Sequence, residues 1–488
     1  MVIRLKHGVS ALLFLCAASL SVVAQDSVIK NKNALPEIGV VASDAMPLDK
    51  EILVGDAVMR QMRGQTPIVR DPVLDEYLQD LGNRLVAHAE GAKFPFSFFW
   101  VNNDAINAFA FFGGHIGVHT GLIRRAENES ELASVLAHEI SHVTQRHIAR
   151  SMQAQQRSTP LAIASMIGGL LVAIANPQAG MAAMQAGQAA SAQMQIDYTR
   201  SNEQEADRIG IAMLARAGYD PYAAATFFST MAEEYRMYSR PPARLLTHPL
   251  TESRVADARS RAADYPKRYT PPSLAFHLAK ARIKARYAFD AGYALEHFTA
   301  QIESGDYTIK RGAQYGLALA HMRNENYDKA AEIIFGSLLK DDPDNLFYLD
   351  AATDISIALD KPAEAIERLA PHLQNTPRNV VLALNQANAM IAAERFDEAV
   401  AILKDFLLVN DEYQIAYEML ADAYRESNQF LDMHQNKAEV YALYGAYSRA
   451  VDELQFAYTF AGDNHLTKQR IRARIKQFRD QQERLKRL

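Results

Sequence analysis

Between positions 327 and 433 the sequence repeats a short pattern, and this repeat constrains the fold more than any other feature. Each copy begins with an aromatic residue or proline and has a small or apolar residue three positions later. The copies lie at 327–330, 362–365, 396–399 and 430–433, so the steps are 35, 34 and 34 residues. A period of this length predicts antiparallel helix pairs that stack into a solenoid with a concave binding face.

Small residues also occur where paired helices of such a solenoid must approach closely. Ala318, Ala387 and Ala421 each lie 12 positions before the end of a copy. The period and this placement are similar to the tetratricopeptide repeat. Ordinary helical hairpins without a common binding face are the alternative. The stretch 264–273 holds three prolines and few apolar residues, so we predict a domain boundary there, with the repeat domain at 269–488.

Residues 1–24 have the layout of a secretory signal peptide. Arg4 and Lys6 precede an apolar run over 9–23, and Ala24 stands before Gln25. A membrane anchor is the alternative, but the apolar run has only 15 residues, whereas a spanning helix needs about 20. We therefore predict export with cleavage near Ala24. The single cysteine of the sequence lies in this segment, which excludes a disulfide framework or a cysteine-ligated metal site from the mature chain.

Charge and apolar content indicate less about binding partners than the repeats do about the fold. With 52 basic and 57 acidic residues, the chain lacks the positive field that holds nucleic acid. The last segment, 468–488, has nine basic and two acidic side chains. We interpret it as a solvated end of the solenoid, with contact to acidic lipid or a partner as the alternative. The apolar segment 161–175 is either a buried helix, or a flap or surface that contacts a membrane or an unfolded client.

Local patterns predict a small sheet followed by a long helix. The stretches 94–101 and 115–123 are β-prone, and Gly113-Gly114 separates them. The segment from about 130 to 152 has helical periodicity and contains His138-Glu139-Ile140-Ser141-His142. Positions i and i+4 share one face of a helix, so both imidazoles can bind one metal ion. Glu139 can then accept a proton from the attacking water.

A second element, 202–207, supplies candidates for the rest of a metal site. A catalytic zinc site needs three protein ligands, and Glu203 could be the third. Asp207 follows one helical turn later and could accept the free N–H of a ligand histidine. The alternative is that these carboxylates only line a solvated helix face, which is how we interpret Glu205. Imidazole and carboxylate ligands suit zinc, although cobalt or manganese would fit as well.

Several other side chains have open interpretations. His248, which precedes Pro249, could be a turn residue, an N–H donor that stabilises the oxyanion together with Arg254, or a ligand that occupies the open metal position and switches the enzyme off. We include His248 and Arg254 among the candidate catalytic residues. His115, His119 and His147 belong to no ligand pattern, and we interpret them as structural.

Together, the His138–His142 motif, the Glu203-x-x-x-Asp207 spacing and His248 with Arg254 resemble the HtpX-type zinc metalloendopeptidases. With the signal peptide and the repeats, the likeness to a periplasmic branch of this family covers essentially the whole chain. It implies an α+β, mainly helical protein, with a zincin-type peptidase domain and small β-sheet over 25–268 and an all-α solenoid after it. It also implies one zinc ion per chain, with His138, His142 and Glu203 as ligands and Glu139 as the base.

The resemblance further implies a substrate-binding edge strand, a location and a set of partners. The edge strand would consist of Asn107, Ala108, Phe109 and Ala110, which could pair with an extended substrate; an ordinary core strand is the alternative. The protein would act in the periplasm as an endopeptidase that degrades misassembled outer-membrane β-barrel proteins and assists their assembly. Its repeats would bind clients or the β-barrel assembly machinery, and the lipopolysaccharide-transport barrel would be a favoured client.

Two rival functions remain at this point. In the first, the protein is a chaperone or scaffold that acts mainly through its repeats with little proteolysis. In the second, the zinc site is purely structural, but a glutamate beside the first ligand argues against that role.

Overall fold

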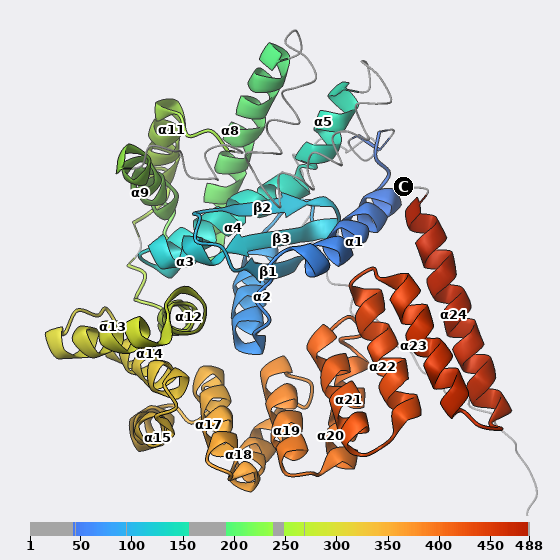
Figure 1. The fold of residues 1–488 in the computed structure, drawn as a ribbon. Helices are drawn as coiled ribbons and strands as arrows, with labels where there is room; N and C mark the ends of the chain where they lie inside the picture. The colour runs from blue at the N-terminus through green and yellow to red at the C-terminus, as the bar shows by residue number, and fades with distance from the viewer. Residues whose placement is uncertain are drawn as a thin grey trace, which may run out of the picture. The chain divides into compact units, whose positions relative to one another are not determined.

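The computed structural model describes residues 42–43, 45–93, 95–155, 192–237, 248–267 and 269–486. The predicted signal peptide and the apolar segment 161–175 lie outside these residues. The described residues form one compact unit, in which a mainly helical region with a small sheet is followed by helices alone (Figure 1). None of the helices in the described ranges is both long and apolar enough to span a membrane.

The first region begins with two helices whose ends follow from local sequence. The second helix, α2, starts where Asp71 and Pro72 predict, because the Asp71 side chain accepts a hydrogen bond from the backbone N–H of Leu74 at 3.3 Å. The helices of this region are α1 (Leu48–Gln65), α2 (Pro72–Val86), α3 (Thr120–Arg125), α4 (Glu129–Thr144), α5 (His147–Gln155), α8 (Ala192–Arg216), α9 (Ala223–Met237) and α11 (Glu252–Ala262).

A three-stranded sheet has the order β1-β3-β2. Strand β1 (Ser97–Val101) pairs parallel to β3 (His115–His119), and β2 (Ala108–Phe111) pairs antiparallel to β3. The short turn η1 (Phe112–Gly114) connects β2 to β3, and Gly113 adopts a φ of +79° there. Strand β2 therefore lies at an edge of the sheet.

The predicted strand at 115–123 is wrong in its second half. The chain leaves the sheet after His119, and α3 begins at Thr120. The reason is the crossing loop at 102–105. The backbone N–H of Gly121 donates to the carbonyl oxygen of Asn103 at 2.8 Å, and a Cβ atom at Gly121 would lie 2.1 Å from the carbonyl oxygen of Asp104. Only glycine allows the backbone to pass this closely.

The predicted helix at 130–152 is two helices. Helix α4 ends at Thr144, and Arg146 adopts a φ of +52° before α5 begins at His147. This left-handed conformation is costly for a side chain larger than glycine. It is held by the buried Arg146 guanidinium, which donates to Glu51 Oε2 at 2.7 Å and to the carbonyl oxygen of Met46. A long-range ion pair thus fixes a break that local periodicity did not predict.

The second region confirms the predicted helical solenoid. Helices begin at Tyr327, Pro362, Phe396 and Phe430, the first positions of the four sequence copies. Each start follows, by two positions, a residue with a φ of 57–59°: Glu325, Asp360, Glu394 and Asn428. Ala318, Ala387 and Ala421 are buried between helices, as expected. Successive sequence repeats therefore share one turn geometry as well as one period.

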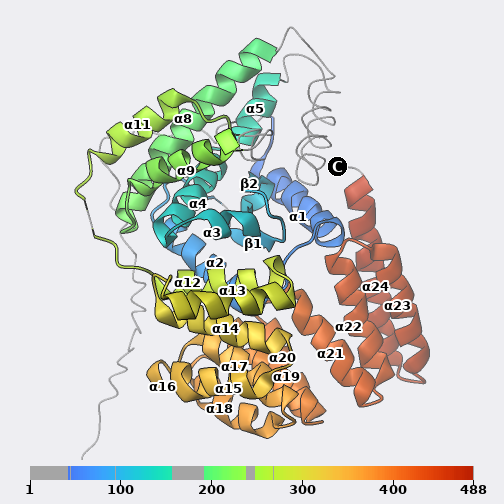
Figure 2. The same cartoon turned by 60° about the vertical axis from the view of Figure 1, so that its left-hand side comes forward.

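The helices of this second region are α12 (Leu274–Ile283), α13 (Ala291–Ser304), α14 (Lys310–Arg323), α15 (Tyr327–Ile333), α16 (Leu339–Asp341), α17 (Leu346–Ala358), α18 (Pro362–Asn375), α19 (Val380–Ala392), α20 (Phe396–Leu407), α21 (Gln414–Glu426), α22 (Phe430–Leu443), α23 (Tyr447–Phe460) and α24 (His465–Lys486). Two short π-helical segments, η2 (Lys284–Ala288) and η3 (Ile334–Leu338), lie among them. Successive helices pack side by side as they progress toward the C-terminus (Figure 2).

The two regions share buried side chains. One hydrophobic cluster extends from Leu74 in α2 and Leu136 in α4 to Phe276 in α12 and Tyr348 in α17. A buried ion-pair network lies at the same junction. Arg282 of α12 donates through Nε to Asp71 Oδ2 at 2.7 Å, and its Nη1 lies 2.6 Å from Asp350 Oδ2 of α17. The boundary near 268 stays a prediction, since the core is continuous across it.

Candidate active site

Helices α4 and α8 bring the two sequence motifs together. His138 and His142 lie one turn apart on α4, and Glu203 and Asp207 lie one turn apart on α8. The helices approach closely at Gly210, where a Cβ atom would lie 3.2 Å from the backbone nitrogen of His138. Glycine at this position lets α8 pack against the backbone of α4, which places the carboxylates of α8 beside the imidazoles of α4.

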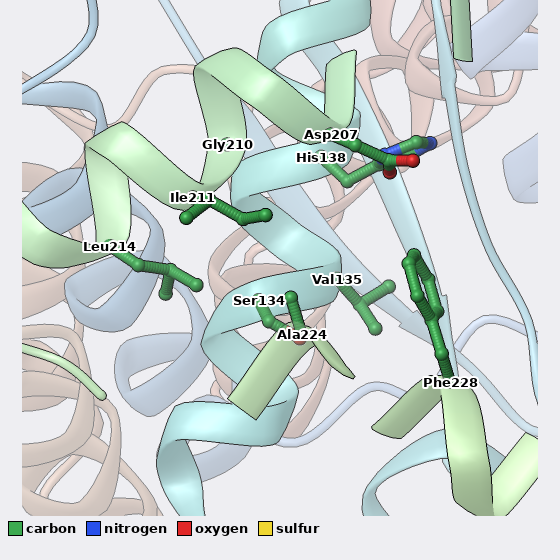
Figure 3. Close-up of a pocket in the computed structure, with 9 residues that line it drawn as sticks. All are labelled: Ser134, Val135, His138, Asp207, Gly210, Ile211, Leu214, Ala224 and Phe228. Carbon is green, nitrogen blue, oxygen red and sulfur yellow. The ribbon is translucent and has the colours of Figure 1, made fainter. Parts of the chain in front are cut away.

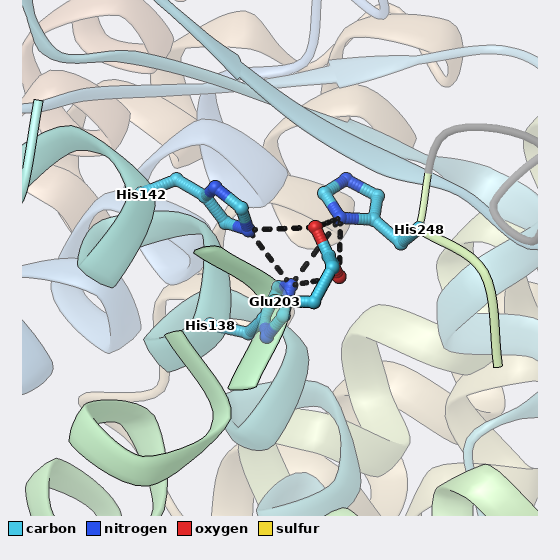
Figure 4. A group of neighbouring side chains, drawn as sticks. All are labelled: His138, His142, Glu203 and His248. Atoms are coloured by element: carbon cyan, nitrogen blue, oxygen red, sulfur yellow. Dashed lines mark hydrogen bonds and ion pairs between the residues drawn. The ribbon is translucent and has the colours of Figure 1, made fainter. Parts of the chain in front are cut away.

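Four side chains converge on one point (Figure 4). One potential ligand atom from each of His138, His142, Glu203 and His248 lies within 4.8 Å of all the others. The Nε2 atoms of His138 and His142 are 3.0 Å apart, and each lies 3.4 Å from an oxygen of Glu203. His248 Nδ1 lies 2.9 Å from Glu203 Oε1 and 3.3 Å from His138 Nε2.

These separations fit a tetrahedral metal ion. Zinc binds nitrogen and oxygen ligands at about 2.0–2.2 Å, so neighbouring ligand atoms of a tetrahedral site lie about 3.3–3.6 Å apart. Five of the six pairs among the four side chains have separations of 2.9–3.4 Å, at or slightly below this range, with His138 and His142 each 3.4 Å from a different oxygen of Glu203. Three imidazole nitrogens and one carboxylate are also the donor types that zinc prefers. The residues present therefore fit a divalent metal ion of this kind.

The charge of the cluster favours a cation. Burial alone would raise the pKa of Glu203, but neighbouring His248, followed by hydrogen bonds from His138 and His142, holds this pKa well below its usual value. The same balance applies to Asp207, whose pKa falls to about 2 because hydrogen bonds from His138 and Arg254 outweigh burial. Both carboxylates are therefore ionised at neutral pH, in a site where they are almost fully buried.

Asp207 lies where the sequence predicted it. Its Oδ1 atom is 2.9 Å from Nδ1 of His138, the ring nitrogen that faces away from the cluster. Arg254 of α11 holds this carboxylate with two hydrogen bonds and also places its Nη1 atom 2.9 Å from Glu203 Oε2. These contacts favour a role for Arg254 in positioning the carboxylates, rather than the direct contact with an oxyanion that the sequence suggested.

Glu139 and His248 lie next to each other at the remaining side of the cluster. Glu139 is 1% exposed, and its Oε1 atom is 3.7 Å from His248 Nε2. His248 thus presents one ring nitrogen to Glu203 and the other to Glu139. Among its three interpretations, this geometry favours the one in which His248 occupies a ligand position.

Sequence reasoning missed two side chains near the cluster. His147 Nδ1 lies 2.9 Å from His142 Nδ1, and His147 Nε2 lies 3.2 Å from Glu205 Oε2. Burial, followed by the neighbouring His142, lowers the pKa of His147 to about 3. Residues five positions apart do not share a face of a continuous helix, so the spacing of the two histidines gave no indication that they are in contact. By contrast, His115 and His119 lie on β3 outside the cluster, as expected.

The surroundings of the cluster restrict where a substrate could approach. Behind His138 and Asp207, between α4, α8 and α9, a cavity of about 20 Å³ is lined mostly by apolar side chains such as Val135, Leu214 and Phe228 (Figure 3). This volume holds roughly one water molecule and no peptide. On another side of α4 lies β2, which carries Ala108, Phe109 and Ala110 of the predicted edge strand, while Asn107 is buried and directly precedes β2.

Comparison with known proteins agrees with this arrangement. The model of peptidase family M48 matches residues 72–262, which include all the residues of the cluster. The chain is 43% identical to the β-barrel assembly-enhancing protease of Escherichia coli strain K12 over 454 residues, or 93% of each chain. A protein of Vibrio cholerae serotype O1, which carries the same name provisionally, is 45% identical over 476 residues, or 97% of each chain. The mitochondrial metalloendopeptidase OMA1 of Arabidopsis thaliana is 30% identical over 135 residues, 27% of this chain and 25% of its own.

Proposed function

This chain belongs to the β-barrel assembly-enhancing proteases and is a metalloendopeptidase with a peptidase family M48 domain, and on that premise we propose that it cleaves misassembled outer-membrane β-barrel proteins with one zinc ion held by His138, His142 and Glu203. The observation that carries the proposal is the convergence of these three side chains at 3.0–3.4 Å, with Glu139 next to His248 of the same cluster.

The roles of the side chains follow from their positions. When bound, zinc supplies a Lewis acid that polarises a peptide carbonyl and makes water a better nucleophile. Glu139 accepts a proton from the attacking water and then donates it to the leaving amine nitrogen. Asp207 accepts the hydrogen bond of His138 Nδ1 and thereby keeps Nε2 of that ring free to bind metal. Arg254 holds both Asp207 and Glu203 in place.

His248 is the proposed control element. Its Nδ1 atom lies among the ligand atoms, 2.9 Å from Glu203. A catalytic zinc site keeps one position open for water or substrate. In this arrangement His248 fills that position, so the enzyme is closed until His248 moves away. Such a closed state suits a protease that acts among many folded proteins.

Substrate binding is proposed at the edge of the sheet. An extended peptide can add to β2, because Ala108–Ala110 lie on an edge strand that contacts α4. Backbone pairing of this kind accepts many sequences, which suits a protease whose clients share misassembly rather than one cleavage site. The edge strand is thus proposed to hold the substrate next to Glu139.

The location and partners are proposed from the family. Similarity to β-barrel assembly-enhancing proteases supports the bacterial periplasm as the compartment, after removal of residues 1–24. It also supports a domain division in which 25–268 cleaves and 269–488 binds clients or the β-barrel assembly machinery, with the lipopolysaccharide-transport barrel as one client.

A chaperone or scaffold function is the second candidate, and one observation favours it. Three aromatic side chains on α22 and α23, Phe430, Phe456 and Phe460, are 39–56% exposed. The rings of Phe430 and Phe460 lie 5.7 Å apart. An exposed aromatic surface of this kind is suited to holding unfolded clients without cleaving them.

The test compares the mature chain with its Glu139→Gln variant. Both are offered a loosely folded polypeptide such as casein, and bound zinc is counted in each. We expect cleavage by the wild type alone at equal zinc content. The variant Glu233→Gln, which changes an exposed glutamate of α9, is the matched control and should cleave like the wild type. Cleavage by Glu139→Gln at the wild-type rate would contradict the role of the base.

The same variant separates the two candidate functions in cells. If Glu139→Gln restores outer-membrane protein assembly to a strain that lacks the protein, the scaffold function is the main one. If it does not, proteolysis carries the function. Failure of both purified proteins to bind zinc would overturn the proposed metal site.

A further inference from the structure

The contact between His142 and His147 determines where the ring protons lie. Their Nδ1 atoms are 2.9 Å apart, so one of the two nitrogens must carry a hydrogen and the other must accept it. In the proposed metal site, His142 Nε2 faces His138 and Glu203 and has to be unprotonated to bind metal. The hydrogen of a neutral His142 is then on Nδ1, and Nδ1 of His147 is the acceptor.

The contact of the other ring nitrogen of His147, Nε2, supports the same placement of the ring hydrogens. When Nδ1 accepts, the ring hydrogen is on Nε2, which lies 3.2 Å from Glu205 Oε2. An ionised carboxylate can only accept, so this direction is the one that satisfies both contacts. Arg150 Nη1 donates to the same oxygen at 2.8 Å and holds it in place. The hydrogen bonds therefore run in one direction, from His142 through His147 to Glu205.

We propose that His147 and Glu205 are positioning residues for the metal site: Glu205, held by Arg150, fixes the tautomer of His147, and His147 fixes the tautomer and orientation of the metal ligand His142. This inference rests on the proposed zinc site and deepens it. These two side chains are neither proposed metal ligands nor the proposed base, so the role is additional to that of the sequence motifs.

The break between α4 and α5 makes this contact. On a continuous helix, residues five positions apart point about 140° away from each other. The left-handed conformation of Arg146 turns the chain so that the His147 ring returns to the face of His142. His147 is 3% exposed, so the hydrogen bond is shielded from water. The ion pair of Arg146 with Glu51 thus maintains the backbone turn on which the contact depends.

The two ligand histidines of α4 are supported in parallel ways. His138 Nδ1 lies 2.9 Å from Asp207, which Arg254 holds. For His142 the acceptor is a neutral ring, and the carboxylate and arginine lie one step further out. Loss of a hydrogen-bond partner of a ligand histidine typically lowers metal affinity 10–100-fold. The same range is expected here.

The experiment measures the zinc affinity of the full mature chain by competition with a chelator at fixed pH. His147→Leu removes the acceptor, and we expect its zinc affinity to fall about 10–100-fold. His147→Asn places an amide oxygen near the position of Nδ1, and we expect it to bind zinc within a few-fold of wild type. His119→Leu is the matched control, because it removes an equally buried imidazole of β3 outside the cluster and should leave zinc affinity unchanged.

The outcomes distinguish hydrogen bonding from packing. Equal losses in His147→Leu and His147→Asn would mean that the ring acts only by its shape, and wild-type affinity in His147→Leu would mean that it does not act at all; either result overturns the proposal. If His147→Leu does not fold, Glu205→Ala replaces it, since Glu205 is partly exposed. We expect a several-fold loss for that variant, and no loss would overturn the proposal. If the wild type binds no zinc, the proposed function itself fails, and this inference fails with it.

Discussion

The guanidinium group of Arg254 donates two hydrogen bonds to the carboxylate of Asp207, at 2.7 and 2.9 Å. Both side chains are about 5% exposed, so the pair is shielded from solvent. The carboxylate stays ionised because its pKa is about 2, and it can accept a hydrogen bond from His138 at any pH near neutrality. A charged pair at the back of the cluster therefore orients His138, the first of the proposed metal ligands.

This relationship predicts that Asp207→Asn weakens metal binding without abolishing folding. The amide is a poorer acceptor for His138 Nδ1, and it no longer neutralises the positive charge of Arg254. Zinc affinity should therefore fall about 10–100-fold in chelator competition. Asp257→Asn, which removes the partner of Arg261 on α11, is the control and should bind zinc normally. Equal affinities in the two variants would contradict the role of Asp207.

Removal of His248 should make the enzyme more active. In His248→Ala the fourth ligand position is free, so cleavage of casein should rise several-fold while most zinc stays bound through His138, His142 and Glu203. The measurement is the initial cleavage rate at equal zinc content. A rate several-fold below the wild type would instead show that His248 stabilises the transition state.

The pH dependence of stability should reflect Asp75 of α2. Burial and the neighbouring Asp71 raise the pKa of Asp75 to about 8, although Tyr413 donates a hydrogen bond to it at 3.1 Å. Between about pH 4 and pH 8 the folded chain therefore keeps a proton that the unfolded chain releases, and stability falls as the pH rises. Each unit of pKa shift corresponds to about 1.4 kcal/mol.

Asp75→Asn cannot release that proton, so it should be more stable than the wild type at pH 8, by about 1 kcal/mol or more, and nearly equal to it at pH 4. Urea denaturation at the two pH values measures the difference. Asp80→Asn, an exposed neighbour on the same helix, should show no such change between pH 4 and pH 8. A constant difference between Asp75→Asn and the wild type across this range would refute the assignment.

Arg282 should be one of the most sensitive positions for stability. It is 1% exposed and lies between Asp71 and Asp350, so Arg282→Met leaves two buried carboxylates without their cation. Breaking a buried ion pair in this way costs about 3–5 kcal/mol, which should lower the midpoint of denaturant unfolding markedly. Arg378→Met, which breaks an exposed pair with Asp405, should change the midpoint little.

Most of the cluster of potential metal ligands could be predicted because its members on α4 and α8 follow helical periodicity. His138 and His142 share a helix face by spacing alone, and Asp207 follows Glu203 by one turn. The solenoid could be predicted for a similar reason, since its period recurs along the sequence. In both cases the relevant neighbours are close in sequence or regularly spaced.

The features that sequence reasoning missed depend on contacts between distant residues. His147 reaches His142 only because Arg146 takes a left-handed conformation, and Glu51, 95 positions away, holds that arginine. The end of β3 depends in the same way on the loop at 102–105. The role of Arg254 was ambiguous for a similar reason, because its partner Asp207 lies on another helix. No local pattern encodes such pairings.

The hydrophobic cluster shared by α2, α4, α12 and α17 has a consequence for how this protein can change over time. A recombination event that exchanged the segment after 268 would leave side chains such as Leu74 facing water and Phe276 without its surroundings. The metallopeptidase region and the helices after it therefore depend on each other to keep these side chains buried. An exchange of either region that keeps the chain folded would need matching substitutions on the other side of this shared core.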